Sequence, residues 1–185
     1  MTRAGSGSRR EALVVLGLAV VATGFLVLAS GRPWATAVLA VPGLPRTEQM
    51  VTGQELVPAA FGLGLAGLAG TLGVLATRGV ARRIASAVLA LCGVGAAVAA
   101  GLATGADSVA DALPATFGAA GVQVHMTAWP VLAVGAGVLA AACGVVAAWR
   151  GPRWPGMGSR YDAPKQQDTE PDMWRSLDRG DDPTL

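Results

Sequence analysis

The chain has 185 residues, of which 52% are hydrophobic and 14% are charged, and its mean hydropathy is +0.50. So little polar surface excludes an ordinary water-soluble domain and indicates a polytopic membrane protein. The formal net charge of +2 says little by itself, because the position of the arginines matters more than their number in such proteins. We expect no nucleic-acid partner.

The first apolar segment, residues 12–30, follows a polar N-terminal tail, residues 1–11. A hydrocarbon core about 30 Å thick takes roughly 20 helical residues, so this run predicts a membrane span. A cleaved export signal is the alternative, since Ser8-Arg9-Arg10 precedes the run. The run is longer than a signal core usually is, and further spans follow it. Gly31 and Pro33 end the predicted helix.

Residues 31–55 form the first predicted outer loop. Two stretches, 34–41 and 47–56, have β-like composition and flank the turn-rich residues 42–45, which favours a hairpin. Gly53 is typical of a bulge. The alanines of the first stretch are weak strand formers, so a collapsed irregular loop would fit as well.

The second predicted span, residues 56–77, begins near Pro58, where a missing amide donor costs nothing. Small residues at Gly62, Ala66 and Gly70 follow each other four apart. Such spacing lets helix backbones approach closely in lipid, so these are candidate helix-packing residues. Alanine and glycine are common throughout the chain, however, and the oligomeric state stays open.

A turn from Arg78 to Arg83, Arg-Gly-Val-Ala-Arg-Arg, leads into the third predicted span, residues 84–106. So short a connection allows only a tight helical hairpin, and its arginines place it in the cytoplasm by the positive-inside rule. Cys92 and Cys143 fall within the third and fourth spans. We interpret both as small apolar fillers and predict no redox role for them.

The second predicted outer loop, residues 107–127, contains His125 and a short alternating pattern in which Val122, Val124 and Met126 are apolar. A period of two predicts a short strand, which could pair with the first-loop hairpin. The side chain of His125 has no partner at ligand spacing. We therefore predict neither a metal ion nor a cofactor.

The fourth predicted span, residues 128–149, has Trp129 and Trp149 at its ends, as in an aromatic belt. Of the 14 lysines and arginines, all except Arg32 and Arg46 fall in segments that this arrangement places inside. The predicted fold is an all-α membrane protein, a four-transmembrane-helix bundle over residues 12–149. Both termini are cytoplasmic, and a small β-element is expected in the outer loops.

After the fourth span, residues 150–161 are basic and rich in tryptophan. Anionic headgroups attract each cation there by about 1 kcal/mol. The acidic residues 162–185 lack apolar periodicity and predict a disordered tail, although Trp174 and Leu177 would also suit a short docking helix. Candidate lipid- or partner-binding residues are Arg150, Arg153, Trp154, Arg160 and Tyr161.

The stretch from Trp149 to Asp162 begins at the last residue of the fourth predicted span and reads Trp-Arg-Gly-Pro-Arg-Trp-Pro-Gly-Met-Gly-Ser-Arg-Tyr-Asp. It resembles the juxtamembrane signature of the tryptophan-biosynthesis-associated membrane proteins, a bacterial family encoded among the genes for tryptophan synthesis. The likeness extends over residues 10–162 and leaves the tail outside. Gly156 and Gly158 stand where alanine and serine are expected. Further matching pieces are Arg32-Pro-Trp34, Thr52-Gly53, Ala76-Thr-Arg78 and Ala128-Trp-Pro130.

This resemblance implies a four-span protein of the bacterial inner membrane with a genetic link to tryptophan synthesis, and it carries over no catalytic residue. The predicted spans contain no charged side chain, which argues against an enzyme and an ion-coupled transporter. We therefore expect a non-enzymatic membrane partner or scaffold for a cytoplasmic or membrane protein. A small transporter for tryptophan, indole or a precursor is the alternative.

Overall fold

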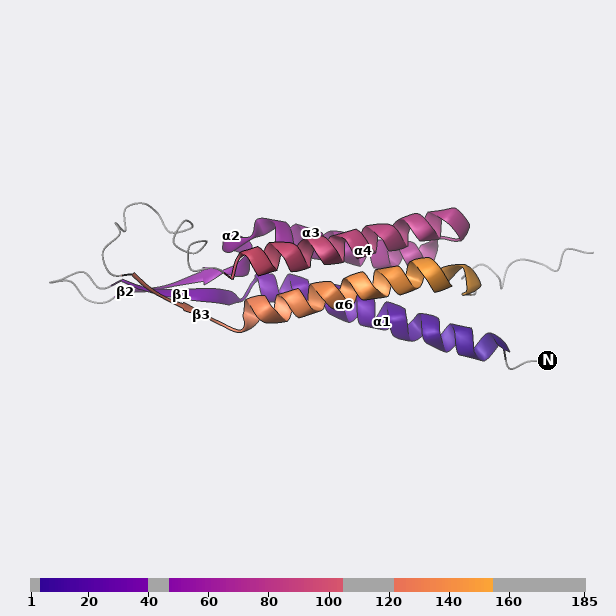
Figure 1. Cartoon of the computed structure of the whole chain (residues 1–185), viewed down its shortest axis with the longest axis horizontal. Coiled ribbons are helices and arrows are strands. Elements are labelled where there is room, and N and C mark those ends of the chain that lie inside the picture. Colours follow the sequence, from indigo (N-terminus) through magenta and orange to yellow (C-terminus); the bar gives the residue numbers. More distant parts are fainter. Residues whose placement is uncertain (1–3, 40–46, 105–121, 155–185) are drawn as a thin grey trace, which may run out of the picture. The chain divides into compact units, whose positions relative to one another are not determined.

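The computed structural model describes residues 4–39, 47–104 and 122–154. Four long helices within these residues pack as a bundle, and a small sheet lies at one end of it (Figure 1). All four are long and apolar enough to cross a membrane, which confirms the prediction of four long apolar helices. The helices are α1 (Ala4–Ser30), α3 (Pro58–Ala76), α4 (Gly79–Leu102) and α6 (Trp129–Arg150).

The two ends of the bundle differ in chemistry. We call one the sheet end, because β1 (Pro33–Leu39), β2 (Thr47–Thr52) and β3 (Val122–Met126) lie there. We call the other the arginine end, where α3 turns into α4 and where α6 ends in a short 3-10 turn, η2 (Gly151–Arg153). A fifth, single-turn helix, α2 (Gly53–Leu56), connects β2 to α3.

The turn at the arginine end is shorter than predicted. Helix α4 begins at Gly79, which has a φ of 59°, so Arg82 and Arg83 belong to its first turns rather than to the loop. Arginine is a good helix former, and its long side chain can reach the polar boundary from within a helix. The predicted turn runs from Arg78 to Arg83 because those residues include three arginines, but the helix begins within this stretch, at Gly79.

Helices α4 and α6 share the most extensive contact in the bundle, and it is made by glycine and alanine. A Cβ atom added at Gly93 would lie 2.4 Å from the backbone nitrogen of Ala141. One added at Gly137 would lie 2.8 Å from the nitrogen of Ala97. The two backbones therefore touch, and close packing takes the place of the hydrophobic effect that drives association in water.

The small residues singled out on α3 do not form one contact line. Among the described residues, Gly62 has no neighbour within 4 Å of an added Cβ, and Ala66 is also exposed. Gly70 lies against Leu89 of α4, whose backbone nitrogen would be 3.4 Å from an added Cβ. Residues four apart drift around a helix of 3.6 residues per turn, so a line that starts on the exposed face reaches the α4 contact only at Gly70.

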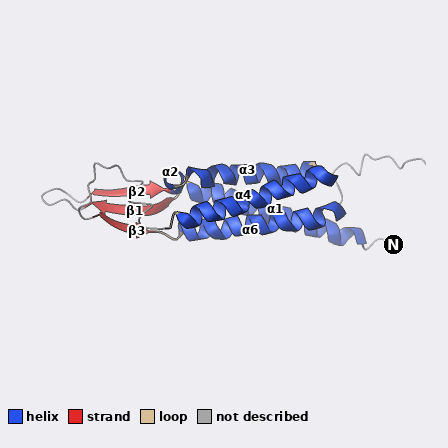
Figure 2. Cartoon of the chain, turned by 45° about the horizontal axis from the view of Figure 1, so that its top comes forward, coloured by secondary structure: helices blue, strands red, loops and turns tan. Residues whose placement is uncertain are grey.

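The sheet confirms the predicted β-element and joins strands from the two segments that were predicted to be outer loops (Figure 2). Its order is β2-β1-β3, and both pairings are antiparallel. In the centre, Thr36 pairs with Met50 on one side and with His125 on the other. The His125 side chain is exposed. The irregularity in the register lies between Pro33 and Ala35 rather than at Gly53.

The second predicted strand was wrong over residues 53–56, which form α2. Thr52 Oγ1 accepts a hydrogen bond from the Glu55 backbone nitrogen at 3.3 Å, and Glu55 Oε2 accepts one from the Thr52 nitrogen at 2.9 Å. These reciprocal bonds form a capping box, which stabilises the start of a helix. The sequence Thr-Gly-Gln-Glu carries this signal, and the β-like composition around it obscured it.

The α4–α6 contact predicts that G93A destabilises the bundle, by about 1–3 kcal/mol, because an added methyl group overlaps backbone that cannot move. G62A is the matched control, since the same change there meets no atom within 4 Å. Thermal unfolding in mild detergent measures both. Equal stability of the two variants would contradict the described packing.

Candidate functional site

The most buried charged side chain in the described residues is Arg82, near the start of α4, with 6% of its surface exposed. Its Nε donates to the Thr77 carbonyl oxygen at 2.9 Å. Its Nη1 donates to the carbonyl oxygens of Gly151 at 2.8 Å and Trp154 at 3.2 Å. A planar guanidinium with five N–H donors suits such a role. One side chain thus joins the end of α3 to the segment that follows α6.

That segment, Gly151–Trp154, is turned back onto the bundle by its own residues. Pro152 cannot continue the hydrogen bonding of α6, so the helix ends and η2 follows. The Trp154 backbone nitrogen donates to the Gly151 carbonyl oxygen at 3.0 Å. Gly151 lies against the Arg82 side chain, whose Cδ would be 3.1 Å from an added Cβ. We call residues 151–154 the return segment.

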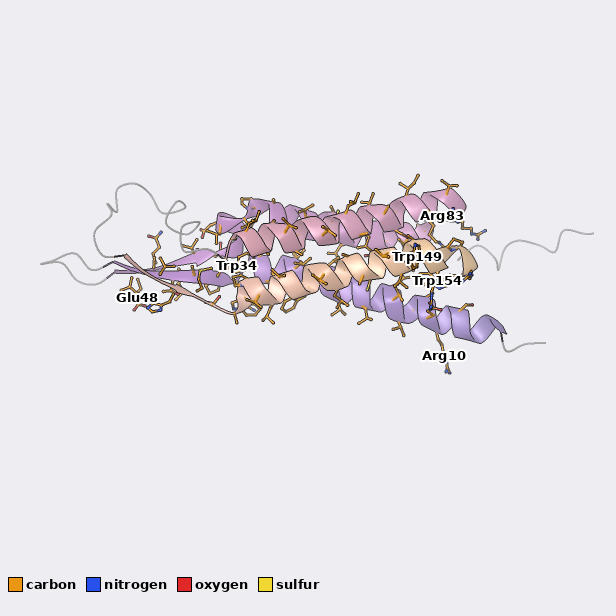
Figure 3. All side chains as sticks on the ribbon, viewed as in Figure 1. Arg10, Trp34, Glu48, Arg83, Trp149 and Trp154 are labelled. Atoms are coloured by element: carbon orange, nitrogen blue, oxygen red, sulfur yellow. The ribbon has the colours of Figure 1, made fainter. Side chains whose placement is uncertain are left out.

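The return segment brings Trp154 into the arginine end of the bundle (Figure 3). Its side chain is 6% exposed and belongs to an apolar cluster with Leu16 of α1, Val74 of α3 and Ala147 of α6. The indole Nε1 is buried and has no hydrogen-bond partner among the described atoms. A buried donor without a partner costs about 1–3 kcal/mol, so the apolar contacts of the ring must offset that cost.

The candidate lipid- or partner-binding residues lie in different environments, some exposed and one buried. Arg150 is exposed and its Nη1 donates to Glu11 Oε1 of α1 at 2.6 Å. Arg153 is exposed, whereas Trp154 is buried and faces neither lipid nor water while the return segment is docked. Composition alone cannot distinguish a tryptophan at the membrane surface from one folded back into the bundle. Arg160 and Tyr161 lie outside the described residues.

The sequence alone did not identify Arg82 and Glu11 as residues that make specific contacts at the arginine end. Arg82 was counted together with Arg78 and Arg83 as a topology signal, although Arg83 is exposed. A usable signal was present, because Arg82 lies on the same helical line as the small and apolar residues that α4 buries. These are Ser86, Leu89, Gly93, Ala96 and Ala100.

A second tryptophan, Trp34, joins the sheet to the bundle. It is fully buried, and its Nε1 donates to the Ala29 carbonyl oxygen at 2.8 Å. Its ring lies on Gly53, where an added Cβ would be 2.3 Å from Cε2. Gly53 is thus required for close approach, not for a bulge. The Thr127 backbone nitrogen donates to the Trp34 carbonyl oxygen at 2.9 Å, which ties the start of β1 to the end of β3.

Trp129, at the start of α6, also belongs to this joint. Its ring lies 6.2 Å from that of Phe25, and the Arg32 guanidinium is 5.8 Å from its centroid. The tryptophan predicted to be a belt residue therefore packs against α1 as well. The three sequence pieces around Arg32–Trp34, Thr52–Gly53 and Ala128–Pro130 meet at the sheet end, although they are far apart in the chain.

These joints contain the motifs that carry the family resemblance, and a family model described as tryptophan-associated transmembrane protein matches residues 15–184. The chain belongs to this family. The match also corrects the extent of the resemblance, because it continues through the acidic tail, whose lack of periodicity had hidden it. No curated protein and no solved structure matches the chain.

Arg82 predicts a measurable difference from its neighbour Arg83. In R82Q the return segment loses hydrogen bonds from a charged donor, which are worth roughly 1.5–3 kcal/mol each. Trypsin cleavage after Arg153 should then be at least about tenfold faster than in the native protein, since cleavage follows local opening. R83Q removes the same charge from an exposed position and should leave the rate unchanged. Equal rates in the two variants would show that Arg82 does not hold the segment.

Proposed function

We propose that the protein is a non-enzymatic membrane partner or scaffold that holds a protein of tryptophan synthesis at the cytoplasmic face of the bacterial inner membrane. The observation that carries this proposal is the docked return segment. Arg82 and Trp154 fix the point at which the chain leaves its last span. A partner of the sequence beyond that point would be tethered to the membrane through this attachment.

The family match supports a role for the sequence that follows the return segment. It runs to residue 184, so the acidic tail belongs to what the family model describes and is not an appendage of this chain. The described surface at the arginine end is basic and aromatic, with Arg83 and Arg153 exposed and with 81% of Trp149 exposed. Anionic headgroups or an acidic protein surface would be attracted there.

The polar groups within the described spans favour a structural bundle. The buried hydroxyls of Thr23, Ser30, Thr71 and Ser86 each donate to a carbonyl oxygen one turn earlier in the same helix, at 2.7–2.9 Å. Such bonds satisfy the hydroxyl locally. The close α4–α6 contact adds to this, because backbones that touch leave no room between those two helices for a solute.

The proposal includes an orientation with the arginine end in the cytoplasm, which the positive-inside rule favours. In a chain with Cys92 and Cys143 replaced, a cysteine at the exposed Gln49 of β2 should react with an impermeant maleimide in intact cells. A cysteine at the exposed Ala81 of α4 should react only after lysis. Labelling of Ala81→Cys in intact cells would reverse the orientation.

Recruitment is tested by cross-linking the tagged protein in its own cells, purifying it in mild detergent and quantifying the enzymes of tryptophan synthesis that accompany it. R153Q/R160Q should reduce their recovery to the level of a strain that lacks the gene. R9Q/R10Q is the matched control, because it removes the same charge from the exposed start of α1 and should preserve recovery.

Two outcomes would contradict the scaffold. If both double variants lose the enzymes equally, general attraction to the membrane surface explains the recovery, and the return segment has no special part in it. If no enzyme is recovered from the native strain while deletion of the gene changes the export of tryptophan or indole, the transporter is the better account.

A further inference from the structure

Three groups of Trp154, its ring, its carbonyl oxygen and its backbone nitrogen, each have a partner at the arginine end, and the nitrogen is held by the 3-10 turn of its own segment. The indole ring lies in the apolar cluster of Leu16, Val74 and Ala147, and its Nε1 has no partner among the described atoms. The carbonyl oxygen accepts from Arg82 Nη1 at 3.2 Å. The backbone nitrogen donates to the Gly151 carbonyl oxygen at 3.0 Å. These three groups correspond to the indole ring, the carboxylate and the ammonium group of free tryptophan.

The other buried tryptophan is held differently. The Nε1 of Trp34 is hydrogen-bonded to Ala29, its ring is closed in by Gly53, and its carbonyl oxygen is bonded to Thr127. Trp34 lies at the start of the central strand of the sheet, so it could not leave without opening both pairings. Trp154 follows a single 3-10 turn, and Arg82 holds it by one bond. It is therefore the more easily displaced of the two.

We propose that this place is a binding site for free tryptophan, and that Trp154 is its tethered occupant. A free tryptophan would put its ring into the same apolar cluster. Its carboxylate would take the place of the Trp154 carbonyl oxygen at Arg82, and its ammonium group that of the backbone nitrogen facing the Gly151 carbonyl. The site thus recognises an indole ring and a carboxylate together, and neither indole nor tryptamine supplies both.

Free tryptophan must compete with Trp154, which the chain keeps close to the site. A short tether gives Trp154 an effective concentration in the millimolar range, which favours the docked state. The free ligand has a compensating advantage, because a hydrogen bond from arginine to a carboxylate is roughly twice as strong as one to a neutral carbonyl. Tryptophan should therefore displace Trp154, but not Gly151, in the native protein at about millimolar concentration.

Displacement would change the surface of the arginine end. The ring of Trp154 would leave the bundle, and its unpaired N–H would gain partners at the membrane–water boundary, where tryptophan is favoured. Arg153 would move with it. This inference is tested on the purified protein alone, so its failure and the failure of recruitment are separate results.

The test is equilibrium binding of radiolabelled L-tryptophan to the purified full chain in mild detergent. W154A removes the tethered competitor and should bind tryptophan at least about tenfold more tightly than the native protein does. W154F keeps an aromatic ring in the cluster and should bind with intermediate affinity, so a folding defect of W154A would not hide the result. W34F changes the same type of residue at the sheet end and should show no gain.

The role of Arg82 separates a built site from simple partition of an indole into detergent. In W154A, tryptophan should bind more tightly than tryptamine, which lacks the carboxylate. That preference should disappear in R82Q/W154A and be weakened in R82K/W154A, which keeps the charge and loses the planar fork. Persistence of the preference without Arg82 would overturn the assignment, as would equal tryptophan binding by W154A, W34F and the native protein.

A second readout uses the native chain. Millimolar tryptophan should accelerate trypsin cleavage after Arg153, because displacement of Trp154 opens the Arg153–Trp154 bond to the protease, whereas phenylalanine at the same concentration should not. Cleavage that tryptophan leaves unchanged while W154A binds it tightly would mean that Trp154 is never displaced, and the proposed competition would be wrong.

Discussion

The arginine end depends on the guanidinium of Arg82. It donates to three carbonyl oxygens at the ends of helices, one from Thr77 and two from the return segment. A buried arginine is costly unless it is hydrogen-bonded, and free carbonyls at a helix end are costly as well. Each group therefore removes the penalty of the other. The same bonds hold Trp154 in the apolar cluster, so the charge and the ring are stabilised together.

Each end of the bundle buries a tryptophan side chain, and the two side chains are held differently. At the sheet end, Trp34 has its N–H satisfied and is held between strand and helix, which makes a permanent joint. At the arginine end, the ring of Trp154 is buried and its N–H has no partner within the part of the chain that the structure describes, which makes a less stable joint. Regions that open for function come from the less stable part of a structure. The scaffold and the tryptophan site proposed above both use the arginine end.

Much of the fold could be predicted because lipid imposes simple rules. Four apolar runs gave four helices, and the alternation of Val122, Val124 and Met126 gave β3 and its place in a sheet with the first loop. Much of what failed depended on neighbours that composition does not identify. The return of Trp154 and the place where the Gly62–Gly70 line meets α4 depend on contacts between distant segments. The capping box at Thr52 is a local signal that the surrounding β-like composition obscured. The candidate site was predicted only as a basic and aromatic stretch, since nothing local shows that Arg82 reaches Gly151.

The order of the strands also limits how the molecule can be assembled. Strand β1 follows the first helix, yet one of its two partners, β3, comes after α4 and just before α6. The return segment likewise follows α6, while its anchor Arg82 belongs to α4. Contacts between residues so far apart in sequence form late, because the intervening chain must be ordered first. Both joints are therefore completed only as α6 enters the bundle, and a chain that stops before its last helix would leave the sheet and the arginine end unfinished at the same time.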